Sequence, residues 1–84
     1  MKRDEALPVY LQTGRMIQDA RRRRDWTQER LASELDVTVK YLQRMEGGRA
    51  NLSLRSLMKL CIALDVTLHE LVPDVPGKLI PGDD

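Results

Sequence analysis

An all-α fold is what this sequence predicts, and three observations lead to it. The chain has 84 residues, enough for one small domain and too short for two. Apolar residues make up 42% of the chain but aromatic residues only 4%, so the core must be aliphatic. Apolar side chains also recur at helical spacing along most of the sequence. We therefore expect a single all-helical domain with one modest core.

The first twelve residues are predicted to be an arm that precedes the first helix. The Leu7-Pro8 step disfavours helix at residue 7, because the proline ring restricts the backbone of the residue before it. A narrow apolar stripe follows at helical spacing, made by Met16, Ile17 and Ala20. This stripe indicates a first helix over about 13–24, with Thr13 as its N-cap.

Residues 27–49 are predicted to form two short helices joined by a tight turn. Thr27 is suited to cap a helix over about 28–35, and Thr38 a second helix over about 38–46. Gly47-Gly48 ends the second helix, since glycine readily adopts the left-handed conformation. The apolar residues that bind the pair together are Leu31, Leu35, Leu42 and Met45. Such a pair leaves one face of the second helix free.

That free face has the composition of a DNA-binding surface. Its residues are Thr38, Val39, Lys40, Gln43 and Arg44. They offer donors, acceptors and one small apolar group, which suit the edges of base pairs. Positive charge is also concentrated here: residues 13–49 hold nine Lys and Arg against six Asp and Glu, although the whole chain carries only +1.

The rest of the chain predicts two more helices and an irregular tail. A long apolar run indicates a helix over about 53–64, namely Leu54, Leu57, Met58, Leu60, Cys61 and Leu64. Thr67 is placed to cap a short fifth helix that ends near Leu71. Residues 73–84 contain three prolines and two glycines, so no helix is expected there.

Several other classes of protein are disfavoured. No stretch approaches the roughly 20 apolar residues of a membrane helix, and no apolar signal region opens the chain, so a cytoplasmic protein is expected. The single Cys61 is expected to be a buried thiol, and His69 has no neighbours at metal-ligand spacing. Because no phosphate loop or catalytic cluster is present either, we expect no enzyme, metal, cofactor or small-molecule ligand.

The motif resembles the helix-turn-helix domain of the phage repressor and Cro type, often called the XRE family. The resemblance covers residues 13 to about 72 and implies a five-helix, lambda-repressor-like fold. It rests on Gly14, Ile17, Arg21, Trp26-Thr27-Gln28, Leu31-Ala32, Leu35, Val37-Thr38, Tyr41-Leu42, Met45 to Arg49, Asn51 to Leu54 and Ala63 to Val66. Asp36 departs from the pattern, since the family usually has Gly in this turn, but Asp tolerates the left-handed conformation. Ala20 also departs, because a larger apolar residue is common there.

The resemblance implies roles for particular residues. The helix over 38–46 would lie in the major groove and contact base edges, with at least one guanine in each half-site. The residues expected to contact phosphate are Gln28, Thr27, Tyr41, Arg49 and Arg24. The resemblance implies this role for Gln28, whereas Arg24 is suggested by the basic run Arg21 to Arg24 and Tyr41 by its position between the third helix and the core. Arg21 and Glu46 are implied to form an ion pair that ties the first helix to the end of the third.

The resulting hypothesis is a transcriptional regulator, a repressor that binds a palindromic operator in double-stranded DNA as a homodimer. Its predicted dimerisation surface combines the fifth helix and the tail, with Leu68, Leu71, Val72, Val75, Leu79 and Ile80. One alternative is an antitoxin or adaptor that binds a partner protein, such as a toxin, through the same fold. A third possibility is a controller protein of a restriction-modification system, which residues 49–54 resemble.

Overall fold

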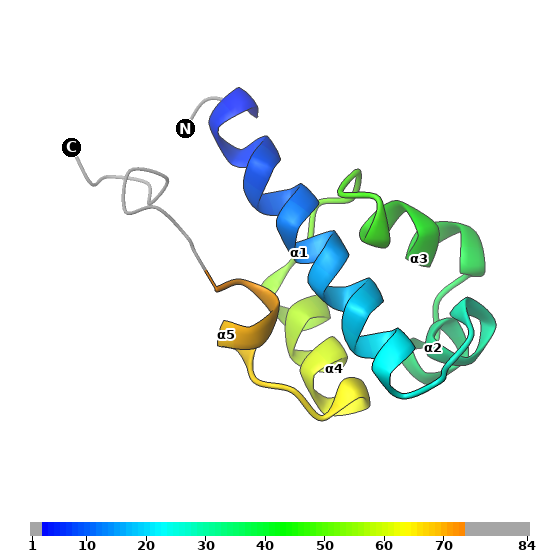
Figure 1. Ribbon diagram of the computed structural model, residues 1–84. Coiled ribbons are helices and arrows are strands. Elements are labelled where there is room, and N and C mark those ends of the chain that lie inside the picture. The colour runs from blue at the N-terminus through cyan, green and yellow to red at the C-terminus, as the bar shows by residue number, and fades with distance from the viewer. Residues whose placement is uncertain (1–2, 74–84) are drawn as a thin grey trace.

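Five α-helices make up the part of the chain that the structure, a computed structural model, describes: residues 3–73 (Figure 1). They are α1 (Arg3–Arg23), α2 (Gln28–Leu35), α3 (Val39–Glu46), α4 (Leu54–Leu64) and α5 (Leu68–Leu71). Helix α1 crosses the molecule and packs against α3, α4 and α5, while α2 packs against α3 and α4. None of these helices is long and apolar enough to cross a membrane. The expected all-α fold is confirmed.

The first helix begins at Arg3 and not at Thr13, so residues 3–12 belong to it rather than to a separate arm. Pro8 lies inside this helix. A proline there removes one backbone hydrogen bond, and tertiary packing has to offset that loss. The packing is visible at Leu11, whose backbone lies directly against Gly48 beyond the end of α3. Thr13 is a buried residue in the middle of α1 and not an N-cap.

The other four helices start close to the predicted residues because a hydroxyl side chain caps each of them. The hydroxyl oxygens of Thr27, Thr38, Ser53 and Thr67 each accept a hydrogen bond from the backbone N–H three residues further on. Aspartates in the left-handed conformation follow three helices: Asp25, Asp36 and Asp65, with φ between 55° and 57°. A carboxylate near a helix C-terminus is electrostatically unfavourable, so turn geometry outweighs charge at these three ends.

The core is aliphatic, as expected, but several apolar residues of α4 remain exposed. The buried apolar residues are Ile17, Ala20, Leu31, Ala32, Leu35, Leu42, Met45, Ala50, Leu60, Leu64 and Leu71. Leu54 and Met58, which belong to the apolar run that predicted α4, are 63% and 54% exposed. The apolar arc of α4 is wider than the single face that the neighbouring helices cover. One part of that arc therefore remains on the surface.

Candidate nucleic-acid interface

A tight turn and shared apolar contacts fix α3 relative to α2. Asp36 adopts the left-handed conformation that the turn requires, with φ 57°. The N–H of Val37 donates to the carbonyl of Ala32 across the turn, at 3.0 Å. Leu31 of α2 and Leu42 of α3 are fully buried. Aspartate in place of the usual glycine thus leaves the turn intact, and α3 keeps one face exposed.

A buried ion pair connects α1 to the C-terminal end of α3. The Nε atom of Arg21 lies 2.8 Å from Oε2 of Glu46, and its Nη2 atom lies 3.2 Å from Oε1. The exposed fractions of these two side chains are only 8% and 3%. Arg21 also donates from Nη1 to the carbonyl of Trp26, at 2.8 Å. The pair implied by the resemblance is thus formed, and loss of either partner would leave a buried charge without compensation.

A chain of hydrogen bonds leads from this ion pair to the exposed face of α3. Gln28 donates from Nε2 to Oε1 of Glu46 at 3.1 Å, and Gln43 donates from Nε2 to Oε1 of Gln28 at 3.2 Å. Gln18 reaches the same Glu46 oxygen from α1, at 3.5 Å. Gln18 was not among the predicted residues, although its position three residues before Arg21 places both side chains on one face of a helix. The carboxylate of Glu46 on α3 therefore accepts hydrogen bonds from both α1 and α2.

The residues expected to contact base edges lie on the side of α3 that faces away from the core. Thr38, Lys40, Gln43 and Arg44 are exposed, whereas Val39 is half-buried. Arg44 donates from Nη2 to the carbonyl of Arg49 at 3.1 Å, which holds its guanidinium near the end of the helix. This face combines two cations, an amide and a hydroxyl around one small apolar side chain. Such a mixture can satisfy the donors and acceptors of a major groove.

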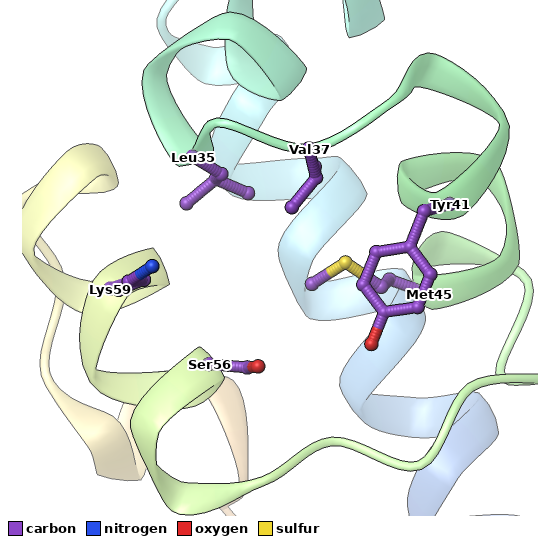
Figure 2. A pocket seen from close by; sticks show the side chains of 6 residues that line it. All are labelled: Leu35, Val37, Tyr41, Met45, Ser56 and Lys59. Carbon is purple, nitrogen blue, oxygen red and sulfur yellow. The ribbon is translucent and has the colours of Figure 1, made fainter.

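The residues expected to contact phosphate lie at both ends of this face. Thr27 and Gln28 form the start of α2, where backbone N–H groups without helical partners favour an anion. Arg49 is exposed just beyond α3. Tyr41 is half-buried and lines a small pocket between α3 and α4, where Figure 2 shows its ring beside Met45. The ring of Tyr41 is thus part of the packing between these helices. Its predicted contact with phosphate would have to be a hydrogen bond from the hydroxyl group.

Arg24 is exposed and makes two contacts within the fold that the sequence did not suggest. Its Nη1 atom donates to the carbonyl of Leu64 at the C-terminal end of α4, at 3.3 Å. Its guanidinium carbon also lies 4.7 Å from the ring centroid of Trp26, while that of Arg30 lies 4.5 Å from the same centroid. These contacts tie the α1–α2 turn to α4. Arg24 therefore has structural contacts, and its contact with phosphate stays a prediction.

Gly14 allows α1 to approach the end of α3 closely. A Cβ atom at this position would lie 2.8 Å from the carbonyl oxygen of Met45 and closer still to that of Glu46. Backbone atoms cannot move aside as a flexible side chain can. The missing side chain therefore permits the short distance across which Arg21 and Glu46 pair.

Comparison with known proteins agrees with this geometry. The family described as Helix-turn-helix matches residues 17–71, which is more than half of the chain. The chain belongs to the helix-turn-helix family. Control protein C.MunI of a Mycoplasma species is 31% identical over 68 residues, which are 80% of this chain and 92% of that protein.

Two solved structures share the fold of this helix-turn-helix protein. The restriction-modification controller protein C.AhdI of Aeromonas hydrophila superposes with a TM-score of 0.70 at 31% identity, covering 74% of this chain and 94% of that one. The hypothetical transcription factor NHTF of Neisseria superposes with a TM-score of 0.72 at 24% identity, covering 83% and 78%. The second likeness concerns the fold alone. Family and geometry together identify a DNA-binding regulator of transcription.

The predicted dimerisation residues of this helix-turn-helix protein differ in how exposed they are. Leu68 is 43% exposed and Val72 is half-buried, but Leu71 is 1% exposed and belongs to the core of its own chain. Leu71 supports α5 and offers no surface to a second protomer. The other three predicted residues, Val75, Leu79 and Ile80, lie outside the described residues.

An exposed apolar stripe on α4 was not recognised from the sequence. It consists of Leu54, Met58 and Ile62, with Ile62 79% exposed. These residues are spaced four apart and therefore line one side of the helix. The signal in the sequence was that α4 has apolar residues over more than one face.

Proposed function

We propose that this protein binds a palindromic operator as a homodimer, placing α3 of each protomer in the major groove, and represses transcription by excluding RNA polymerase. The observation that carries the proposal is the exposed polar face of α3, held at a fixed angle by the turn at Asp36 and by the buried Arg21–Glu46 pair. A rigid helix is needed because direct base contacts require side chains at defined positions.

Each residue of this face has a chemical role in the proposal. Lys40 and Arg44, four residues apart on one side of α3, are suited to donate to O6 and N7 of guanine. Val39 presents a small apolar surface to a thymine methyl group. Thr38 uses its hydroxyl oxygen to cap α3 and keeps its hydroxyl proton for a DNA acceptor.

Phosphate contacts would flank the base contacts and set the register of the protein on the duplex. Thr27 and Gln28 at the start of α2 would supply one set, because the first N–H groups of a helix lack helical partners and the Gln28 amide has a second proton beside the one given to Glu46. Arg49 supplies a cation on the other side of α3, together with the hydroxyl of Tyr41. We also propose a cytoplasmic location, in a bacterium that carries the gene on its chromosome, a phage or a plasmid.

The homodimer is proposed to form through the α4 stripe of Leu54, Met58 and Ile62, together with Leu68 of α5. A twofold axis brings the same patch of both protomers together, and apolar residues spaced four apart can pack against their own copy. An exposed apolar row of this kind marks an interaction site more often than a free surface. A twofold dimer also presents two α3 helices to the two halves of a palindrome.

Among the subtypes of regulator, we favour a controller protein of a restriction-modification system. C.AhdI bears that description and C.MunI that of a control protein, and each is 31% identical over most of this chain. These relatives give no support to the antitoxin or adaptor alternative. The subtype predicts that the genes beside this one encode a nuclease and a DNA methyltransferase, which inspection of the genomic neighbourhood tests.

The proposed function is tested by selecting binding sites from a randomised duplex library and titrating the winning sequence by fluorescence anisotropy. We expect an inverted repeat with at least one guanine in each half-site, and an affinity at least a thousandfold above that for random DNA. Titrations at two salt concentrations should show log K falling steeply with log salt, since Lys and Arg displace counterions. Equal affinity for all sequences would contradict the proposal.

A further inference from the structure

The hydrogen bonds around Glu46 determine the orientation of two glutamine side-chain amides, that is, which neighbour the NH2 group faces and which the carbonyl oxygen faces. The carboxylate of Glu46, paired with Arg21, can only accept hydrogen bonds. The Gln28 group that faces it at 3.1 Å must therefore be the NH2 group. This turns the Gln28 carbonyl oxygen toward Gln43, whose facing group must in turn be its own NH2 group, at 3.2 Å. A buried charge thus orients the amide of an exposed residue.

The orientation of Gln43 decides what this residue can recognise. One of its two amide protons is used by Gln28, which leaves one N–H and the carbonyl oxygen free on the exposed face of α3. A donor beside an acceptor matches adenine, which presents N7 as an acceptor and N6 as a donor in the major groove. An amide that rotated freely could equally present its groups in the reverse order. Fixing the amide in advance removes that ambiguity before DNA arrives.

We propose that Gln28 is a positioning residue for base recognition: held by Glu46, it orients Gln43 so that Gln43 contacts an adenine in each half-site. The inference rests on the proposed function, because it assigns one base position of the operator. It also gives Gln28 a part in specificity beyond the contact to phosphate. A phosphate contact alone would change the affinity for every sequence by the same factor.

The test uses site selection with the unchanged protein and four variants on the randomised duplex library. Gln43→Ala identifies the position that Gln43 contacts, where adenine preference should fall by roughly 5- to 100-fold. Gln28→Met keeps the side-chain length but removes both hydrogen bonds. It should lower adenine preference at that same position by about two- to tenfold, the worth of one hydrogen bond. In the double variant Gln28→Met should have no further effect on base preference.

Gln18→Met is the matched control, because Gln18 also donates to Glu46 but has no hydrogen bond to Gln43. It should leave the base preference unchanged, and thermal unfolding shows whether all variants remain folded. The relay is overturned if Gln28→Met leaves adenine preference intact, if Gln18→Met lowers it equally, or if Gln43→Ala affects a base other than adenine. A wild-type protein that selects no sequence at all would instead overturn the proposed function, and the relay with it.

Discussion

Two exposed helix faces of this small domain differ in how they are prepared for a partner. The face of α3 is polar, and its Gln43 and Arg44 are held by hydrogen bonds. The face of α4 is apolar, with Leu54, Met58 and Ile62 in a row and no polar group among them. Base recognition depends on direction, so it needs oriented donors and acceptors. Apolar association is non-directional and needs only matching surface.

The two faces also depend differently on the rest of the fold. The polar face is supported from beneath by the Arg21–Glu46 pair, so damage to the pair should disturb DNA recognition. The apolar face lies on α4, whose inner side is anchored by Leu60 and Leu64. We therefore expect changes beneath α3 to alter stability and specificity together, and changes on the outer side of α4 to alter assembly alone.

The largest expected effect comes from Arg21→Ala, which removes the support of the polar face. It should lower the free energy of unfolding by about 3 to 5 kcal/mol, since Glu46 is then left as a buried charge. Chemical denaturation followed by circular dichroism measures the loss. The double variant with Glu46→Ala should be less damaged than the sum of the two single variants. Additive losses would show that the two residues do not act as a pair.

Ile62→Ala tests the apolar face and should weaken the dimer while leaving the protomer folded. Each interface residue occurs twice about a twofold axis, so the loss is about 2 to 4 kcal/mol for the two copies, or a dimer Kd raised more than tenfold. Sedimentation equilibrium measures the Kd. Because Ile62 is 79% exposed in the protomer, the helical content should not change. Leu68→Ala tests the contribution of α5 in the same way, and an unchanged Kd in both variants would contradict the proposed interface.

Cys61 supplies an independent measurement of the same interface. It is half-buried and lies one helical turn from Leu57 and beside Met58, at the edge of the stripe. Burial, together with the nearby charge of Glu70, raises the pKa of its thiol. Labelling by an alkylating reagent should therefore be slow at neutral pH and accelerate as the pH rises toward that pKa. At any one pH, labelling should slow further as protein concentration drives dimerisation.

The sequence predicts the starts of some helices better than others. The caps at Thr27, Thr38 and Ser53 mark the starts of α2, α3 and α4 because capping is a local interaction. The start of α1 was missed, since contact with Gly48, distant in sequence, offsets the local cost of Pro8. Local rules cannot reveal a contact of that kind.

The candidate site shows the same division. The residues on the free face of α3 follow from helical periodicity once Leu42 and Met45 are placed in the core. The network around Glu46 depends on three helices that meet in space, so no spacing in the sequence predicts it. The hydrogen bond from Arg24 to a carbonyl 40 residues away cannot be predicted from the basic run to which Arg24 belongs. The exposure of the α4 stripe cannot be predicted either, because periodicity identifies apolar residues but not which of them are covered.

Lys40→Ala and Arg44→Ala test the polar face directly, at a smaller expected cost. Each should weaken binding to the selected operator by about 1 to 3 kcal/mol and leave binding to random DNA nearly unchanged. Anisotropy titrations on both DNAs measure the difference. Arg49→Ala is the contrasting variant, since an exposed cation that contacts phosphate should weaken binding to all sequences alike. Equal losses on both DNAs for Lys40 or Arg44 would reassign that residue to phosphate.

Asp36→Asn is expected to have the smallest effect, a gain in the free energy of unfolding of about 0.3 to 1 kcal/mol. Asparagine tolerates the left-handed conformation of this turn but removes the negative charge from the C-terminal end of α2. The gain should shrink at high salt, because an exposed charge is screened. Asp19→Asn, an exposed position more than one turn before the end of α1, is the control and should change little. A loss of stability in Asp36→Asn would contradict this prediction and mean that a cation stabilises the carboxylate. Lys59 lines the same surface groove as Asp36, so Lys59→Ala would be the next variant to measure.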